Sequence, residues 1–144
     1  MLSSIQLELK VYTKITLQIQ TNNSFNVESG GNLEGLQGSF SSLNYPDDYI
    51  NYLNCTWIIT VPEGLRINLT FSAFNIEEDY DTVTIYEDDE EVAQFTDDGI
   101  PEPFMSNTST IRVVFETDES IVESGFFANY QIGKNETFIC RAIF

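Results

Sequence analysis

Apolar and polar residues alternate along much of this chain with the period of two that is typical of β-strands. The clearest example is segment 66–73, in which every second side chain is apolar. Successive side chains of a strand point to opposite faces, so one face of this segment would be buried and the other solvated. The buried face is predicted to contain Ile67, Leu69, Phe71 and Ala73.

Further alternating segments occur at short intervals separated by turn residues. Thr56 to Val61 is a predicted strand that contains Trp57, and Pro62-Glu63-Gly64 forms the turn into the next strand. No helical period extends over a full window. Many short strands with regular turns predict an all-β fold, a two-sheet antiparallel β-sandwich. The remaining apolar positions are Val83 and Ile85, Val92 and Phe95, Ile111, Val113 and Phe115, and Phe126, Ala128, Tyr130 and Ile132.

The same pattern divides the chain into three parts. A chain of 144 residues with 42% hydrophobic content can bury one core. Residues 33–133 are the predicted domain, and residues 134–144 are a tail. Residues 1–32 are an extension, in which alternation over 5–11 and 15–19 suggests a hairpin that turns near 12–14. The Asn, Ser and Gly residues of 22–32 are typical of a linker.

The charge balance is strongly acidic, with 23 acidic and 6 basic residues and a net charge of −17. Such a charge keeps a protein soluble and argues against nucleic acid or anionic lipid as partners. It favours cations and basic protein surfaces. The densest acidic run, Glu87 to Glu91, is interpreted as a solvated hairpin loop, with a contact for a basic partner as the alternative.

The residue inventory argues against catalysis by this chain. It contains no histidine, which excludes Ser-His-Asp and Cys-His arrangements and zinc sites of the His-Glu-x-x-His kind. A glycosidase would need two acids about 5–10 Å apart across a sugar-sized cleft. A sandwich of this size offers no obvious cleft of that depth, so we predict that the chain is not an enzyme.

Glycosylation sequons indicate an extracellular protein. Asn-x-Ser/Thr is meaningful only on a chain that passes through the secretory pathway. Segment 1–20 does not resemble a signal peptide, because charged residues interrupt its apolar run, and no stretch approaches the roughly 20 apolar residues of a membrane helix. We therefore interpret the chain as a piece of a larger secreted or membrane-anchored protein that does not itself insert into the membrane. The sequons are at Asn22, Asn54, Asn68, Asn107 and Asn135.

Five separated motifs occur in one order between residues 38 and 132. This order and spacing resemble a CUB domain, an extracellular β-sandwich of jelly-roll type that recognises other proteins. The resemblance covers about two thirds of the chain. The motifs are Gly38 to Pro46 (GSFSSLNYP), Cys55-Thr56-Trp57, Phe74 to Asp81 (FNIEEDYD), Phe115 to Ser120 (FETDES) and Gly125 to Tyr130 (GFFANY).

The resemblance implies a calcium site. In CUB domains that bind calcium, the positions matching Glu77, Asp81 and Asp118 bind the ion, the position of Ser120 adds a backbone carbonyl, and the hydroxyl at Tyr49 orients the Glu. Carboxylate oxygens are the ligands that Ca²⁺ requires. Without an ion, three converging carboxylates would repel one another and raise at least one pKa.

One departure from the family concerns the loop before Asp81. Most members have a longer loop with a cysteine whose partner lies after the following hairpin, whereas here the loop is shorter and segment 95–99 has no cysteine. The joint absence is consistent with loss of a whole disulfide. If the shorter loop moves Glu77 away from the ion, Glu78 or Asp79 would replace it.

Cys55 and Cys140 are the only cysteines. The family cysteine at Cys55 usually pairs with one at the amino-terminal edge of the domain, but no cysteine precedes Cys55 here. Cys140 is the available partner, and a bridge closing about 85 residues would constrain the unfolded chain by roughly 4–5 kcal/mol. The equally weighted alternative is a buried free thiol at Cys55, with Cys140 belonging to a neighbouring module.

These observations predict a calcium-dependent protein-binding module whose partner presents a basic side chain, commonly Lys in this family. Carbohydrate binding is a second hypothesis, in which the charge disfavours sulfated glycans and leaves neutral sugars. A glycosylated spacer without a ligand is the third.

Overall fold

The computed structural model describes residues 17–18, 26–27 and 29–133, and the statements below concern these residues. All regular elements within them are strands. They are β1 (Leu17–Gln18), β2 (Asn26–Val27), β3 (Gly30–Glu34), β4 (Gln37–Ser41), β5 (Asn54–Thr60), β6 (Ile67–Asn75), β7 (Thr82–Glu87), β8 (Glu90–Phe95), β9 (Phe104–Met105), β10 (Thr110–Glu116) and β11 (Gly125–Ile132).

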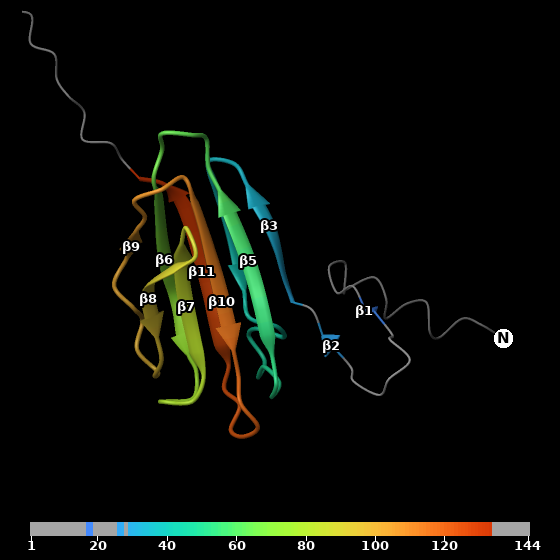
Figure 1. Ribbon diagram of the computed structural model, residues 1–144. Helices are drawn as coiled ribbons and strands as arrows, with labels where there is room; N and C mark the ends of the chain where they lie inside the picture. Colours follow the sequence, from blue (N-terminus) through green and yellow to red (C-terminus); the bar gives the residue numbers. More distant parts are fainter. Residues whose placement is uncertain (1–16, 19–25, 28, 134–144) are drawn as a thin grey trace, which may run out of the picture.

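Two sheets form the sandwich that the alternation predicted (Figure 1). One sheet has the strand order β3-β5-β10-β7-β8, and the other has the order β4-β11-β6-β9. Neighbouring strands are antiparallel except at one edge, where β3 runs parallel to β5. The prediction of an all-β sandwich is confirmed.

Aromatic side chains fill the space between the sheets. Phe126 of β11 is fully buried, and its ring centroid lies 5.3–6.3 Å from those of five other aromatic rings, mostly in edge-to-face geometry. Such pairs add to the stabilisation that burial of apolar area already gives. The surrounding rings are those of Phe40, Trp57, Phe71, Phe74 and Phe115.

One predicted core position in β6 is wrong. Burial alternates from Ile67 to Phe71, but Ala73 is only half-buried and Phe74 is buried instead. The register against β11 shifts here, because Phe127 is paired with Ala73 while Ala128 is paired with Phe71. A bulge inserts one extra residue and therefore exchanges the faces of the residues that follow it.

The acidic run between β7 and β8 is not wholly solvated, which corrects the interpretation of Glu87 to Glu91. The hairpin turns at Asp88 and Asp89, whose φ angles of 49° and 65° are those of a two-residue turn between twisted strands. Glu87, by contrast, is 6% exposed, and both of its carboxylate oxygens accept a hydrogen bond from the backbone N–H of Asn107, at 2.9 and 3.1 Å. This carboxylate therefore joins the hairpin to the segment before β10.

The first strand of the five-stranded sheet begins at Gly30, inside the segment interpreted as a linker. Gly30 has a φ of 125°, and a Cβ atom there would lie 1.9 Å from the Thr56 carbonyl oxygen, so only glycine allows β3 to approach β5 this closely. β1 pairs with β2. Of the hairpin predicted over 5–19, only Leu17 and Gln18 are among the described residues, and the tail 134–144 lies outside them.

Replacing Glu87 by Ala should lower the free energy of unfolding by about 1–3 kcal/mol, because the Asn107 N–H loses a charged acceptor. Urea denaturation measures this loss. Glu91→Ala, which removes an exposed acid from the same run, is the matched control and should change stability little. Equal effects of the two substitutions would show that Glu87 acts only through the overall charge.

Candidate metal centre

The loop between β6 and β7 and the loop after β10 meet at one end of the sandwich. Glu77 follows β6 by two residues, Asp81 immediately precedes β7, and Asp118 follows β10 by two residues. β7 and β10 are antiparallel neighbours, and Thr82 is paired with Glu116, so the start of one strand lies beside the end of the other. The loop after β10 is at the lower end of the sandwich in Figure 1.

The structure brings the three acids together. One carboxylate oxygen from each of Glu77, Asp81 and Asp118 lies within 4.8 Å of the others. Asp81 is fully buried, Glu77 is 8% exposed and Asp118 is half-buried. Three ionised carboxylates this close together repel one another, and two of them are buried. A bound cation would relieve this repulsion.

Asp81 is held at the centre of the cluster by two donors. The Tyr49 hydroxyl donates to Oδ2 of Asp81 at 2.5 Å, and the Asp118 backbone N–H donates to Oδ1 at 2.9 Å. The same Tyr49 oxygen accepts a hydrogen bond from the Glu77 backbone N–H at 3.0 Å. Tyr49, whose hydroxyl was expected to orient the Glu, contacts both the Glu77 backbone and the Asp81 carboxylate.

Hydrogen bonds within the loop after β10, and from the segment before β5, fix its position. Oδ1 of Asp118 accepts from the Ser120 backbone N–H at 2.7 Å and from the Ser120 hydroxyl at 3.3 Å. Asn51 donates through Nδ2 to the Glu119 carbonyl at 2.8 Å, and the Tyr52 backbone N–H donates to the Asp118 carbonyl at 2.8 Å. Asn51 and Tyr52 were not predicted, because their roles depend on contacts with residues more than 60 positions away along the chain. The Ser120 carbonyl as a metal ligand stays a prediction.

The electrostatics of the cluster are unfavourable without a cation. Burial raises the pKa of Glu77, and the negative charges of Asp118 and Asp81 raise it further. Burial also raises the pKa of Asp81, although its hydrogen bonds from Tyr49 and Asp118 oppose the shift. Oε2 of Glu77 is buried and has no hydrogen-bond partner among the described residues. An orphaned oxygen on a carboxylate that lies close to two others fits a hard, oxygen-binding cation.

The shortened loop keeps Glu77 in the cluster. Neither Glu78 nor Asp79 belongs to it. Thr96, which lies in the segment without the family cysteine, accepts a hydrogen bond from the Asp79 backbone N–H at 2.9 Å and donates one to the Glu77 carbonyl at 3.3 Å. A threonine hydroxyl thus joins the two segments that a second disulfide joins in most of the family.

Cys55 is fully buried, and burial raises the pKa of its thiol to about 12. It is the only cysteine among the described residues and contacts the backbone of Ser29. Cys140 lies outside the described part of the chain, so both the bridge and its alternative stay predictions, which peptide mapping without reduction would separate.

The described sequons have different surroundings. Asn54 and Asn107 are exposed, and Asn68 is half-buried on the outer face of β6. Asn22 and Asn135 lie outside the described residues. Glycosylation of all five stays a prediction.

A comparison of the sequence with known proteins identifies the family of this domain. The profile of the CUB domain family matches residues 29–130. The chain belongs to the CUB domain family. CUB domains are noncatalytic modules, so this domain is not itself a catalyst. No helix in the described ranges is long and apolar enough to cross a membrane.

Two solved structures and one curated relative illustrate the similarity. The structure of the MASP-1 CUB2 domain bound to Ca²⁺ is 26% identical with a TM-score of 0.67, and the match covers 72% of this chain and 98% of that one. The extracellular region of zebrafish Gpr126/Adgrg6 is 31% identical with a TM-score of 0.65, covering 70% of this chain and 14% of that one. Ovochymase-2 of Mus musculus is 37% identical over 113 residues, which is 74% of this chain and 18% of the relative.

In the presence of a chelator, the cluster should make stability depend on pH. Because the native pKa values of Glu77 and Asp81 are raised, the folded state binds protons more readily than the unfolded chain. The free energy of unfolding should therefore rise as the pH falls from neutrality through the raised values, and level off below the ordinary values of about 4.

Urea denaturation between pH 4 and 8 measures this slope. Glu77→Gln should reduce it, whereas Glu91→Gln, which removes an exposed acid of equal charge, should leave most of it. If both variants had the wild-type slope, the dependence would come from bulk charge repulsion and not from the cluster.

Proposed function

We propose that this chain is a calcium-dependent module that binds an extracellular protein through a basic side chain. The observation that carries the proposal is the buried, unpartnered Oε2 of Glu77 inside a cluster of three carboxylates. A divalent cation bound there would relieve both the missing contact and the mutual repulsion.

Calcium fits this donor set better than a softer metal. The described cluster contains only carboxylate oxygens, and Ca²⁺ takes six to eight oxygen ligands at about 2.3–2.6 Å. Glu77, Asp81 and Asp118 would hold the ion, and the Ser120 carbonyl and water would complete its coordination. The bound ion would supply positive charge that orders the two loops carrying these ligands. The calcium reported for the similar MASP-1 CUB2 domain supports this assignment.

The surface beside the cluster suits a basic partner. A trough of about 520 Å³ is lined by Glu77 together with further acids and by the side chains of Tyr80 and Ile121. Tyr80 and Ile121 are 67% and 62% exposed, and Tyr52 on the neighbouring loop is 74% exposed. Exposed aromatic groups next to carboxylates provide apolar anchors around an ionic contact. The other acids of the trough are Glu78, Asp79, Asp98 and Glu123.

An extracellular location is part of the proposal. Five sequons are meaningful only on a chain that passes through the secretory pathway, and the similar Gpr126 structure is that of an extracellular region. The chain spans about a fifth of the length of the curated relatives that it matches, so we propose that it acts as one module of a secreted or membrane-anchored protein.

The chain should bind one Ca²⁺ with a dissociation constant of about 10⁻⁵ to 10⁻³ M. Millimolar Ca²⁺ should raise the melting temperature, since a ligand that binds only the folded state stabilises it, by about 2.7 kcal/mol at 100 times its dissociation constant. Asp118→Ala should abolish the shift, and Asp89→Ala, at an exposed turn, should retain it. Equal shifts in the two variants would show that the ion only screens bulk charge.

The trough should recognise a lysine side chain. In Ca²⁺-saturated protein, Nα-acetyl-lysine amide should shift the backbone NMR signals of Tyr80 and Ile121 in a saturable way. The same amide of norleucine, which lacks the ammonium group, should not. Because the attraction is electrostatic, added salt should weaken binding. At physiological ionic strength, salt already screens exposed charges beyond a Debye length of about 8 Å. Equal shifts with both probes would contradict a basic contact at this end.

A further inference from the structure

The outer face of the β4-β11-β6 sheet carries no charged side chain at its outward positions, although the chain has a net charge of −17. Burial alternates along these strands, so the outward positions follow from the pattern. An uncharged, hydrogen-bonding face on so acidic a protein requires an explanation. The outward residues are Gln37, Ser39 and Ser41 of β4, Phe127, Asn129 and Gln131 of β11, and Asn68, Thr70 and Ser72 of β6, with Ala73 and Asn75 of β6 beyond the bulge.

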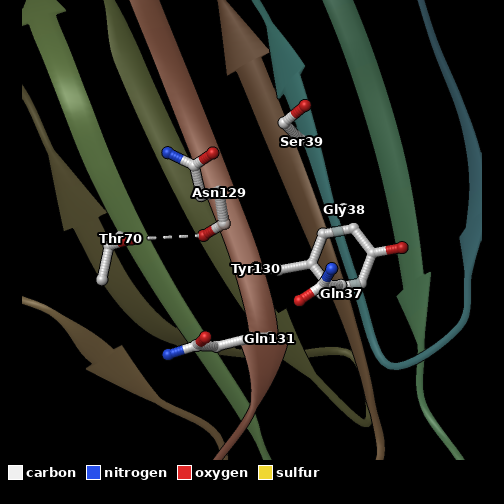
Figure 2. A pocket seen from close by; sticks show the side chains of 7 residues that line it. All are labelled: Gln37, Gly38, Ser39, Thr70, Asn129, Tyr130 and Gln131. Atoms are coloured by element: carbon white, nitrogen blue, oxygen red, sulfur yellow. Dashed lines mark hydrogen bonds between the residues drawn. The ribbon is translucent and has the colours of Figure 1, made fainter.

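A shallow trough of about 530 Å³ lies across this face. Figure 2 shows Thr70 of β6, Asn129 and Gln131 of β11, and Gln37 and Ser39 of β4 around it, with Thr70 donating to the Asn129 carbonyl at 3.5 Å. The side-chain amide groups of Gln37 and Gln131 have no hydrogen-bond partner within the described ranges. Each amide offers both donors and acceptors. The backbone of Gly38 and the side chain of Tyr130 complete the lining.

A glycosylation sequon begins at the edge of this trough. Asn68 of the sequon Asn68-Leu69-Thr70 is half-buried and lies on the same outer face as Thr70, which is two positions along β6. Its strand partners are Gln131 on one side and Met105 on the other, and Met105 is 39% exposed. A glycan attached to Asn68 would therefore start next to Gln131.

The other described sequons have different settings. Asn54 lies in the opposite sheet, and its Nδ2 donates to the Glu116 carboxylate at 2.8 Å. Asn107 is exposed between β9 and β10, beside the side chains of Arg66 and Glu87. Neither belongs to the uncharged trough, so these two positions serve as internal controls.

We propose that the trough is a docking site for the N-linked glycan of Asn68, whose first N-acetylglucosamine residues lie across β11 toward β4. Sugar hydroxyl and acetamido groups donate and accept hydrogen bonds, as the amides of Gln131 and Gln37 do. No charge has to be desolvated when a neutral sugar covers this face. From β6 to β4 the distance is two strand spacings, about 10 Å, which is the scale of a disaccharide.

The glycan would shield this face of the sandwich and leave the carboxylate end accessible. The inference depends on passage through the secretory pathway but not on calcium or on the protein partner. Failure of the calcium proposal would therefore leave it standing, and its own failure would not affect the metal centre.

Site-resolved deglycosylation tests the proposal. The full chain, directed into the secretory pathway of cells that attach only oligomannose glycans, is treated under native conditions with an endoglycosidase that cuts between the first two sugars. Glycopeptide mass spectrometry follows each site. The glycan on Asn68 should be cut about tenfold more slowly than those on Asn54 and Asn107, because hydrogen bonds must open first. All sites should be cut equally after denaturation.

An unmodified Asn68, or one whose glycan is cut as fast as that on Asn107, would overturn the proposal. Trough variants separate docking from crowding at the attachment point. Gln131→Ala and the more distant Gln37→Ala should each bring cutting at Asn68 toward the rate at Asn107. Gln94→Ala removes an exposed side-chain amide on the opposite sheet. This variant is the matched control and should not change the cutting rate at Asn68. Protection that survives both trough substitutions would also overturn it.

Discussion

The buried carboxylate of Asp81 is the interaction on which the functional end of this molecule depends. It accepts hydrogen bonds from the Tyr49 hydroxyl and from the Asp118 backbone, and the same Tyr49 oxygen receives the Glu77 N–H. Three loops that are remote in sequence are joined through one side chain. A buried charge with these contacts cannot be removed without leaving its partners unsatisfied, so the positions of the loops depend on one another.

The aromatic core extends this constraint into the body of the sandwich. The Tyr49 ring packs edge-to-face on Phe115 at 5.2 Å, and Phe115 packs on Phe126 at 5.3 Å. Phe126 in turn contacts rings from both sheets. A site held by residues whose own positions are locked by packing is preorganised for a ligand. Here the preorganised groups are all acidic, so the apo cluster destabilises the fold that a cation would stabilise.

Two regions of the surface differ in chemistry: the loop end of the sandwich and the outer face of the four-stranded sheet. The loop end combines carboxylates with exposed Tyr52, Tyr80 and Ile121, which is where we propose that a protein partner binds. The outer face of the four-stranded sheet is polar and uncharged, which suits a sugar better than a basic protein. If both proposals hold, recognition takes place at the end of the sandwich and shielding along its side.

Most of the fold followed from local pattern, because alternation with a period of two marks a strand whatever it packs against. The strand segments were accessible in this way, the resemblance to CUB domains followed from five motifs in one order, and the fold and the family were confirmed. The candidate ligands came from spacing that matched a family motif.

The details that sequence could not supply depend on which strand or loop lies alongside. The bulge opposite Phe127 and Ala128 exchanges Ala73 for Phe74 in the core, and it exists only because β11 pairs with β6 in that register. Nothing in the local sequence distinguishes Glu87 from the other acids of its run. Its role depends on the hydrogen bond from the Asn107 backbone N–H. The choice of Glu77 over Glu78 or Asp79 rests on Tyr49 and Thr96, far away along the chain. Local pattern determines which face a side chain can take, whereas contacts between distant segments determine which charges and polar groups meet.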